Sequence, residues 1–226
     1  MVMRMAEAII LCGGAGWRLK PHTWVPKPLL PLLETPTKKT LLDLQIEWLK
    51  KHGFKKIILA SNQRLEVSEE VLEVIEEEKL GTGGAVKNAL REVTEEQVYV
   101  MNVDDIVSYN PQSLFEYSDA GAAILLARPH LGFGVVRLEG DFVTGFEEKP
   151  LLDFYVSAGH YVFKREIIEK YFPNRGDLER KTLPTLAINK LLKGMKLEGK
   201  WYTINTYKDY INVKKLVEDR RIKLFV

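Results

Sequence analysis

The sequence predicts an α/β protein: a single, doubly wound and mostly parallel sheet with a small antiparallel portion. Strand-like and helix-like segments alternate in the first half of the chain, which is typical of βαβ units. In the second half, Glu139-Gly140-Asp141 separates two strand-like runs and indicates a hairpin. No internal repeat or obvious linker divides the 226 residues. We therefore expect one domain over residues 1–226.

Hydrophobic periodicity predicts the elements of the first half. The apolar run 8–11 is typical of a buried strand, and the helical spacing of apolar residues over 41–51 predicts a helix that Gly53 ends. The pattern of residues 71–75 fits either the end of a helix or a short strand. The other predicted elements are strands over 56–60, 98–102 and 122–127 and helices over 85–93 and 111–119.

The second half combines strands with shorter helices. The predicted hairpin pairs residues 134–138 with residues 142–147. The other expected elements are a strand over 155–163, helices over 167–171 and 183–192, a segment over 199–205 and a closing helix through Val217.

Composition restricts the class of protein. The 33 basic and 31 acidic residues give a net charge of only +2, so we expect neither a nucleic-acid nor a membrane partner. A hydrophobic content of 46% is ordinary for a chain that buries a core, and no stretch approaches the length of a membrane span. The single cysteine cannot form an internal disulfide. These features predict a cytoplasmic protein.

A glycine loop after the first predicted strand is the most informative feature of the chain. Gly13, Gly14 and Gly16 let the backbone approach a ligand closely and turn its N–H groups toward an anion. Arg18 offers a bidentate fork for phosphate, and Lys27 a compact positive charge between two prolines. The pattern lacks the Gly-Lys-Ser/Thr ending of the P-loop and a correctly spaced GxGxxG. It predicts a nucleoside triphosphate site near the N-terminus.

Two carboxylates follow the predicted strand 98–102. Asp104 and Asp105 lie just past its carboxyl end, the edge at which open α/β sheets bind ligands. Carboxylates there suit Mg²⁺, which takes one or two protein oxygens together with phosphate oxygens and waters. A turn or helix-capping role is the alternative. We expect Asp105 to be a supporting or a solvated residue.

Two further segments are less specific on their own. The glycines around Thr82 fit either a close backbone approach to a flat ligand or a simple turn before a helix. Glu148 and Lys149 form an acid–base pair at a strand end, and such a pair is more often an exposed ion pair than a working site. His160 is expected to be a packed strand residue.

The motifs together resemble a known family. Leu-x-Gly-Gly-x-Gly-x-Arg-Leu-x-Pro, followed by Pro-Lys-Pro-Leu-Leu-Pro, is similar to the signature of the sugar-1-phosphate nucleotidyltransferases, which have a Rossmann-like, GT-A-like fold. The glycine pair at 83–84 looks like that of heptose- and mannose-1-phosphate guanylyltransferases. The resemblance covers about residues 6–217. It implies a nucleotide-binding part over about 6–130 and a sugar-phosphate-binding part over about 131–217.

The resemblance also implies roles for individual residues. Arg18 would bind the β/γ-phosphates, Lys27 the α-phosphate and Lys149 the phosphate of the sugar 1-phosphate. Asp104 would bind Mg²⁺, the implied cofactor. The other implied contacts are with the nucleoside, through Leu11, Gly13, Gly14, Gly16, Gly81 and Thr82, and with the sugar, through Asn102, Glu148, Ser157 and Gly159.

One position departs from the family pattern. Residues 201–209 resemble Trp-x-Asp-Ile-Gly-Thr-x-x-Asp, in which the first Asp is the second metal ligand, and here Thr203 stands in its place. A neutral hydroxyl cannot replace an anionic carboxylate on Mg²⁺. Either Asn205 or Asp209 contributes, or Asp104 holds the metal with phosphates and waters.

The expected activity is Mg²⁺-dependent formation of an NDP-sugar and pyrophosphate from an NTP and a sugar 1-phosphate. One alternative is a CTP-dependent transferase acting on a polyol or inositol phosphate. Another is a regulatory homologue that binds a nucleotide sugar without turnover, which Thr203 favours. The nucleobase, the sugar and the formation of a homo-oligomer are left open.

Overall fold

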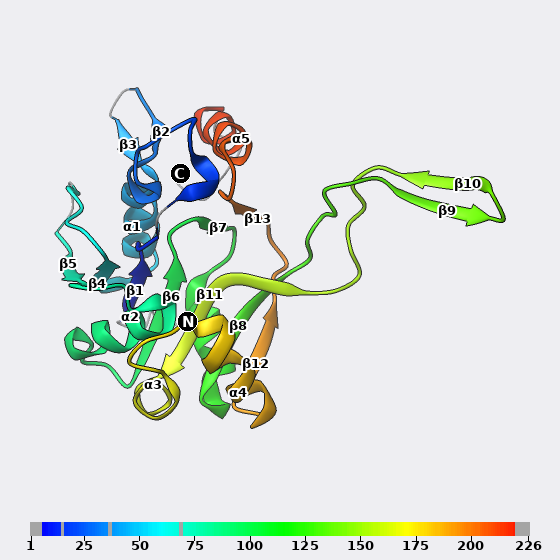
Figure 1. The fold of residues 1–226 in the computed structure, drawn as a ribbon. Helices are drawn as coiled ribbons and strands as arrows, with labels where there is room; N and C mark the ends of the chain where they lie inside the picture. Colours follow the sequence, from blue (N-terminus) through cyan, green and yellow to red (C-terminus); the bar gives the residue numbers. More distant parts are fainter. Residues whose placement is uncertain (1–5, 15, 36–37, 68–69, 220–226) are drawn as a thin grey trace.

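A seven-stranded sheet forms the centre of the computed structural model, which describes residues 6–14, 16–35, 38–67 and 70–219 (Figure 1). The strand order is β12-β8-β11-β6-β1-β4-β5. Strands β6, β1, β4 and β5 are mutually parallel, and β12 is parallel to β8. Only β11 runs antiparallel to both neighbours. The predicted mostly parallel sheet is thus confirmed. Its strands are β1 Ala6–Leu11, β4 Phe54–Ser61, β5 Leu72–Ile75, β6 Gln97–Asn102, β8 Ala122–Ala127, β11 Val156–Lys164 and β12 Leu192–Lys196.

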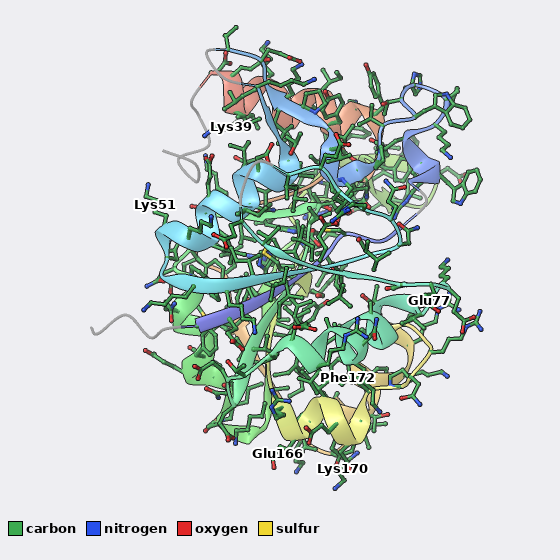
Figure 2. The ribbon with its side chains drawn as sticks, turned by 90° about the vertical axis from the view of Figure 1, so that its left-hand side faces the viewer. Lys39, Lys51, Glu77, Glu166, Lys170 and Phe172 are labelled. Atoms are coloured by element: carbon green, nitrogen blue, oxygen red, sulfur yellow. The ribbon has the colours of Figure 1, made fainter. Side chains whose placement is uncertain are left out.

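Helices cover both faces of this sheet, as a doubly wound fold requires. In β1, Ala8 and Ile10 point into one core while Ile9 and Leu11 point into the other, because successive side chains of a strand alternate between faces. In Figure 2, α1, which carries Lys51, and α3 lie on opposite sides of the sheet. The first core includes α1 Leu41–Lys51 and α5 Tyr207–Glu218, and the second includes α2 Gly81–Ala89, α3 Arg165–Tyr171 and α4 Leu183–Ile188.

Two capping boxes set where α1 and α5 begin. Asp43 N donates to Thr40 Oγ1, and Thr40 N donates to Asp43 Oδ2 at 2.8 Å. The same reciprocal pair joins Thr206 and Asp209 at the start of α5. Such caps satisfy backbone N–H groups that the first helical turn leaves unpaired.

Several predicted elements differ in extent. Residues 71–75, left open by the sequence, include strand β5. The helix expected over 85–93 begins four residues earlier, at Gly81, and the segment 111–119 lies in a 3₁₀ helix, Pro111–Ala120. The helix expected over 183–192 ends at Ile188, because residues 192–196 pair with β8 as β12. Within 199–205, only Trp201–Thr203 (β13) is a strand, and it pairs with β7 Asp105–Val107.

The predicted hairpin is present and extends far from the body of the molecule (Figure 1). Within the part of the chain that the structure describes, its strands, β9 Val135–Glu139 and β10 Phe142–Glu147, pair only with each other. A smaller ladder joins β2 Pro31–Leu33 to β3 Lys39–Thr40. No helix among the described residues is long and apolar enough to cross a membrane. Short helical turns complete the described chain at Trp17–Leu19, Lys27–Leu29, Leu90–Glu92 and Leu178–Thr182.

Candidate active site

A cavity of about 350 Å³ opens beyond the carboxyl ends of β1 and β6. These neighbouring parallel strands end in register, with Leu11 beside Asn102, so the segments that follow them converge. This is the edge at which open α/β sheets bind ligands. Of the predicted site residues, the cavity is lined by Leu11, Gly13, Gly14, Gly16, Arg18, Lys27, Thr82, Asn102 and Asp104.

The glycine loop forms one wall of the cavity. Gly14 (φ 137°) and Gly16 (φ 58°) have the positive φ angles that favour glycine, so the backbone itself requires them. Gly13 is different, because a Cβ atom built on it would meet no atom of the described residues beyond its chain neighbours within 4 Å. No contact with the described residues explains a glycine at position 13, and its place at the cavity fits the close approach of a ligand that the sequence predicted.

The two basic residues come from short helical turns in the loop. Arg18 lies in the turn Trp17–Leu19, which the fully buried Leu19 side chain anchors to the first core. Lys27 opens the turn Lys27–Leu29 and is held between Pro26 and Pro28. Both side chains line the cavity, so the structure brings together the two positive charges that the sequence predicted for phosphate.

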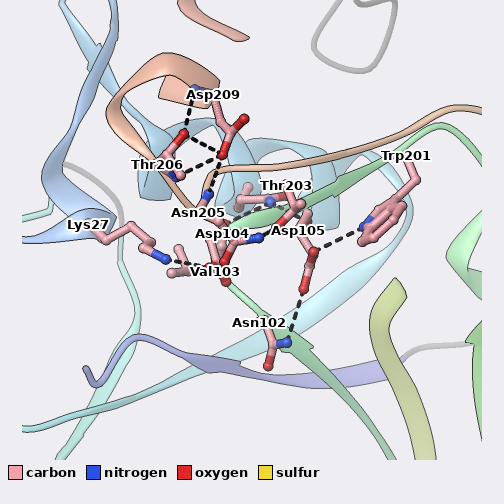
Figure 3. A network of polar contacts seen from close by, with 11 residues as sticks. Lys27, Asn102, Val103, Asp104, Asp105, Trp201, Thr203, Asn205, Thr206 and Asp209 are labelled. Atoms are coloured by element: carbon pink, nitrogen blue, oxygen red, sulfur yellow. Dashed lines mark hydrogen bonds and ion pairs between the residues drawn. The ribbon is translucent and has the colours of Figure 1, made fainter. Parts of the chain in front are cut away.

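Lys27 forms an ion pair with Asp104 (Figure 3). Lys27 Nζ lies 2.6 Å from Asp104 Oδ2, and both side chains are about one-fifth exposed. The backbone of Asp104 is also fixed, since its carbonyl oxygen accepts a hydrogen bond from Ile204 N. A predicted phosphate ligand and the predicted metal ligand are therefore in contact across the cavity.

Asp105 lies behind Asp104 and is buried, so the solvated role is wrong and the supporting role holds. Its carboxylate accepts hydrogen bonds from Trp201 Nε1 and Asn102 Nδ2, each at 3.0 Å (Figure 3). Burial and the charge of Asp104 raise the pKa of Asp105 to about 7, although these hydrogen bonds oppose the shift. Gly159 makes room for the carboxylate, because a Cβ atom there would lie 1.9 Å from Asp105 Oδ2.

The residues around Thr203 separate into different roles. Asp209 is occupied by the cap of α5, where its Oδ2 accepts from Asn205 N and Thr206 N. Asn205 lines the cavity together with Asp104, and its Nδ2 donates to Thr203 Oγ1 at 3.1 Å. Because this hydrogen bond uses the amide nitrogen of Asn205, the amide oxygen is the atom that could bind a metal ion. Of the two residues that the sequence offered in place of a carboxylate at position 203, the geometry favours Asn205 over Asp209.

These donors fit Mg²⁺. Asp104 and Asn205 offer hard oxygen atoms, and Mg²⁺ commonly uses one or two protein ligands and completes its octahedron with phosphate oxygens and waters. Within the described ranges, no group of three or more His, Cys, Asp or Glu side chains is arranged to hold a metal by itself. Such a site would depend on the phosphates of a bound nucleotide.

Glu179 is a cavity residue that the sequence did not reveal. Thr82 Oγ1 donates to Glu179 Oε2 and accepts from Leu178 N, both at 2.8 Å, which joins the start of α2 to the turn Leu178–Thr182. No motif surrounds Glu179, so only tertiary contact could identify it. Gly81 is outside the cavity lining and has a structural reason, because its φ is 77° and a Cβ atom there would lie 2.8 Å from Gly176 C.

Of the residues predicted for the sugar side, Asn102 lines this cavity, whereas Glu148, Lys149, Ser157 and Gly159 are outside its lining. Lys149 and Glu148 lie on the chain leaving β10, with Lys149 Nζ 3.3 Å from Glu148 Oε1 and both exposed. Ser157 Oγ is 2.9 Å from the Tyr161 hydroxyl and accepts from Gly159 N. Apart from Asn102, the predicted sugar-side residues are therefore not assembled around the cavity in this structure.

Comparison with known proteins identifies the family. The sequence model of a family described as "Nucleotidyl transferase" matches residues 7–220. The chain belongs to this family. The resemblance of this chain to the family, which the glycine loop and the Pro-Lys-Pro segment predicted, is confirmed.

Individual relatives agree with this membership. The chain is 31% identical over 231 residues to a mannose-1-phosphate guanyltransferase of Debaryomyces hansenii, covering 91% of this chain and 63% of that protein. It is 34% identical over 179 residues to the D-glycero-alpha-D-manno-heptose 1-phosphate guanylyltransferase of Campylobacter jejuni, covering 73% and 79%. Thus the chain spans less than two thirds of the length of the first relative.

A solved structure shares the fold. HddC from Yersinia pseudotuberculosis, in a crystal structure of its complex with GMP-PN, superposes with a TM-score of 0.71 at 25% identity. The match covers 94% of this chain and 100% of HddC. The α/β architecture described above is thus that of known nucleotidyltransferases.

Proposed function

We propose that the chain is a sugar-1-phosphate nucleotidyltransferase that makes an NDP-sugar and pyrophosphate from an NTP and a sugar 1-phosphate. The observation that carries the proposal is the convergence of Arg18, Lys27 and Asp104 on one cavity beyond β1 and β6. Two positive charges and one carboxylate are the groups needed to bind a triphosphate with its metal. Family membership supports the same activity.

The reaction requires little covalent work from the protein. An oxygen of the sugar phosphate attacks the α-phosphorus in line, and the bond from the α-phosphorus to the bridging oxygen breaks to release pyrophosphate. Alignment and charge neutralisation therefore carry the rate. In this proposal Arg18 binds the β/γ-phosphates and stabilises the departing pyrophosphate, while Lys27 neutralises the α-phosphate.

Mg²⁺ is the proposed cofactor, held by Asp104 and by the amide oxygen of Asn205. When bound, Mg²⁺ would neutralise phosphate charge. Before substrate arrives, Lys27 holds the Asp104 carboxylate in place at 2.6 Å. The ion pair keeps both side chains positioned and largely out of water. An incoming phosphate then offers Lys27 a second anionic partner.

A guanosine nucleotide is the proposed donor, and a hexose or heptose 1-phosphate the proposed acceptor. One support is the names of the relatives, which are guanylyltransferases. The other is the Gly83-Gly84 pair, buried in the first turn of α2, which resembles that of such enzymes. The cytoplasm is the proposed compartment, because the lone cysteine is buried and free.

One observation favours a second candidate function. Thr203 replaces a carboxylate that the family pattern would supply to the metal, which favours a regulatory homologue that binds a nucleotide sugar without turnover. Against this candidate, the charged phosphate and metal contacts Arg18, Lys27 and Asp104 are all present in the cavity.

A screen of pyrophosphate release tests the proposal. ATP, GTP, CTP and UTP are each combined with glucose, mannose and heptose 1-phosphates and with inositol and polyol phosphates, with and without Mg²⁺. We expect Mg²⁺-dependent release with GTP and a hexose or heptose 1-phosphate. Turnover only with CTP and a polyol or inositol phosphate would show instead that the chain is a CTP-dependent transferase acting on that acceptor. Binding of an NDP-sugar without turnover in any combination would establish the regulatory function instead.

A further inference from the structure

A second cavity, of about 190 Å³, adjoins the glycine loop. The candidate active site opens beyond β1 and β6, whereas this second cavity is lined in part by residues that follow β4, the neighbour of β1 on its other side. The two cavities share Cys12, Gly14, Gly16 and Lys27 in their linings. The glycine loop and Lys27 therefore form a wall common to both cavities.

The groups that line the second cavity suit an anion. Lys20 and Lys27 both line it, and no Asp or Glu is among its described lining residues. The side-chain amides of Asn62 and Gln63 add neutral N–H donors. Asp104 already balances the charge of Lys27, at 2.6 Å. Within the described part of the chain Lys20 forms no such ion pair, so its positive charge is available to a ligand.

Two indole rings hold the Lys20 ammonium at the border between the cavities. Lys20 Nζ lies 4.2 Å from the centroid of the Trp17 ring and 4.6 Å from that of the Trp24 ring. Trp17 lines the first cavity and Trp24 the second. The two side chains are 73% and 72% exposed, so core packing does not account for them. Cation–π attraction orients the ammonium without cancelling its charge, as a carboxylate would.

The reaction proposed above releases an anion beside this cavity. When the bond to the α-phosphorus breaks, its electron pair stays with the bridging oxygen, and pyrophosphate gains a negative charge. A cavity of about 190 Å³ is below the ~300–1,000 Å³ that is typical for drug-sized ligands, and so suits a small anion better than a nucleoside. Because Lys27 lines both cavities, an anion that passes between them would stay close to a positive charge.

We propose that the second cavity is a product subsite, in which Lys20 binds the pyrophosphate that has left the α-phosphorus. The inference rests on the proposed function, because that reaction supplies the ligand. Arg18 acts in the first cavity while the bond breaks, and Lys20 acts afterwards in the second. Trp17 and Trp24 are positioning residues, which hold Lys20 between the two cavities. Moving the product out of the line of attack opposes the reverse reaction.

Calorimetry with inorganic pyrophosphate and Mg²⁺, without nucleotide, tests this subsite. Lys20→Met removes the charge but keeps an unbranched side chain over the indoles, and should weaken pyrophosphate binding by ~10–100-fold, the value of a charge-assisted hydrogen bond. The affinities for GMP and for a nonhydrolysable GTP analogue should be unchanged, since their phosphates remain in the first cavity. Lys170→Met is the matched control: its ammonium also lies over an aromatic ring, that of Tyr171 at 5.1 Å, but outside both cavities.

Two substitutions at Trp24 test the positioning role. Trp24→Leu removes the aromatic face and should weaken pyrophosphate binding by ~2–5-fold, the value of an exposed cation–π contact. Trp24→Phe restores an aromatic face and should recover most of that affinity. In turnover assays, Lys20→Met should raise the inhibition constant of pyrophosphate while the KM for the NTP stays the same. Circular dichroism checks that each variant is folded.

Three results would overturn the inference. They are a wild type that binds no pyrophosphate at millimolar concentration, a Lys20→Met variant that keeps wild-type affinity or loses the GTP analogue equally, and an equal loss in Lys170→Met. The calorimetry does not depend on catalysis. Turnover in the nucleotide screen without Lys20-dependent pyrophosphate binding would overturn this inference alone. Lys20-dependent binding without turnover would keep the anion site and overturn the proposed function.

Discussion

Asp105 and Thr203 lie directly opposite each other in the antiparallel ladder between β7 and β13. The family pattern predicts a carboxylate at position 203, and this chain carries one across the ladder, at position 105. The Asp105 carboxylate is turned toward Trp201 and Asn102 rather than into the cavity. It therefore supports the site from behind, and Asp104 remains the carboxylate that lines the cavity.

Replacing Thr203 by Asp should restore an anionic ligand and place two carboxylates opposite each other. We expect tighter Mg²⁺ binding in the presence of a nonhydrolysable NTP. Without metal, the free energy of unfolding should fall by about 0.2–1 kcal/mol, because like charges directly opposite repel. Calorimetry and urea unfolding with and without Mg²⁺ measure both effects. Thr203→Asn is the neutral control, and Asp104→Asn should remove the Mg²⁺ response altogether. Unchanged affinity in Thr203→Asp would place the metal elsewhere.

Arg18→Ala should lower kcat by ~10²–10³ while weakening ground-state NTP binding much less. The reason is that the charge on pyrophosphate grows as it leaves, so the donor acts mainly in the transition state. Steady-state kinetics and equilibrium nucleotide binding separate the two effects. Arg91→Ala, which removes an exposed arginine outside the cavity, controls for net charge. Near-normal turnover in Arg18→Ala would contradict the assigned role.

Lys149→Ala should raise the KM for the sugar 1-phosphate by ~10–100-fold, the value of a charge-assisted hydrogen bond, with little effect on NTP affinity. Because Lys149 lies outside the nucleotide cavity, the two phosphates would occupy separate subsites. Arg137→Ala on β9 is a control for loss of a positive charge from the same hairpin segment. Equal loss of affinity for both substrates would assign Lys149 a structural role.

Gly13→Ala should weaken nucleotide binding without lowering the melting temperature. Among the described residues, apart from its chain neighbours, the added methyl group meets no atom within 4 Å, but it would project where we expect a ligand to approach the loop. Gly81→Ala is the matched comparison and should lower the melting temperature, because its φ is 77° and its Cβ would lie 2.8 Å from Gly176 C. Differential scanning fluorimetry with and without GTP measures both. Destabilised Gly13→Ala, or unchanged GTP binding, would contradict the prediction.

Stability should fall in acid through His160. Complete burial lowers the pKa of His160 to about 3, from the usual 6.5. Between these values the unfolded chain binds a proton that the folded chain does not, so stability is complete above pH 6.5 and is lost as the pH falls toward 3. One such proton corresponds to ~1.4 kcal/mol per pH unit. His160→Gln should reduce the slope of the unfolding free energy by that amount between pH 4 and 6. An unchanged slope would mean that another group dominates.

Residues that act locally could be predicted from the sequence. Gly13, Arg18 and Lys27 follow one apolar strand within a short stretch, and Asp104 follows another. Because parallel strands present their carboxyl ends at one edge, such positions imply a shared site before any contact is known. The hairpin was predictable for a similar reason, since Glu139-Gly140-Asp141 is a turn within one segment.

Only tertiary structure decided the features that depend on residues far apart in the chain. Pairing with β8 makes residues 192–196 a strand, although the helix predicted from the local pattern extended to residue 192. Burial beneath Trp201 and Gly159 makes Asp105 a supporting group, and contact with Thr82 brings Glu179 to the cavity. Local sequence determines which groups are available and where the backbone can turn. Which of them meet, and which are removed from water, depends on long-range register and packing.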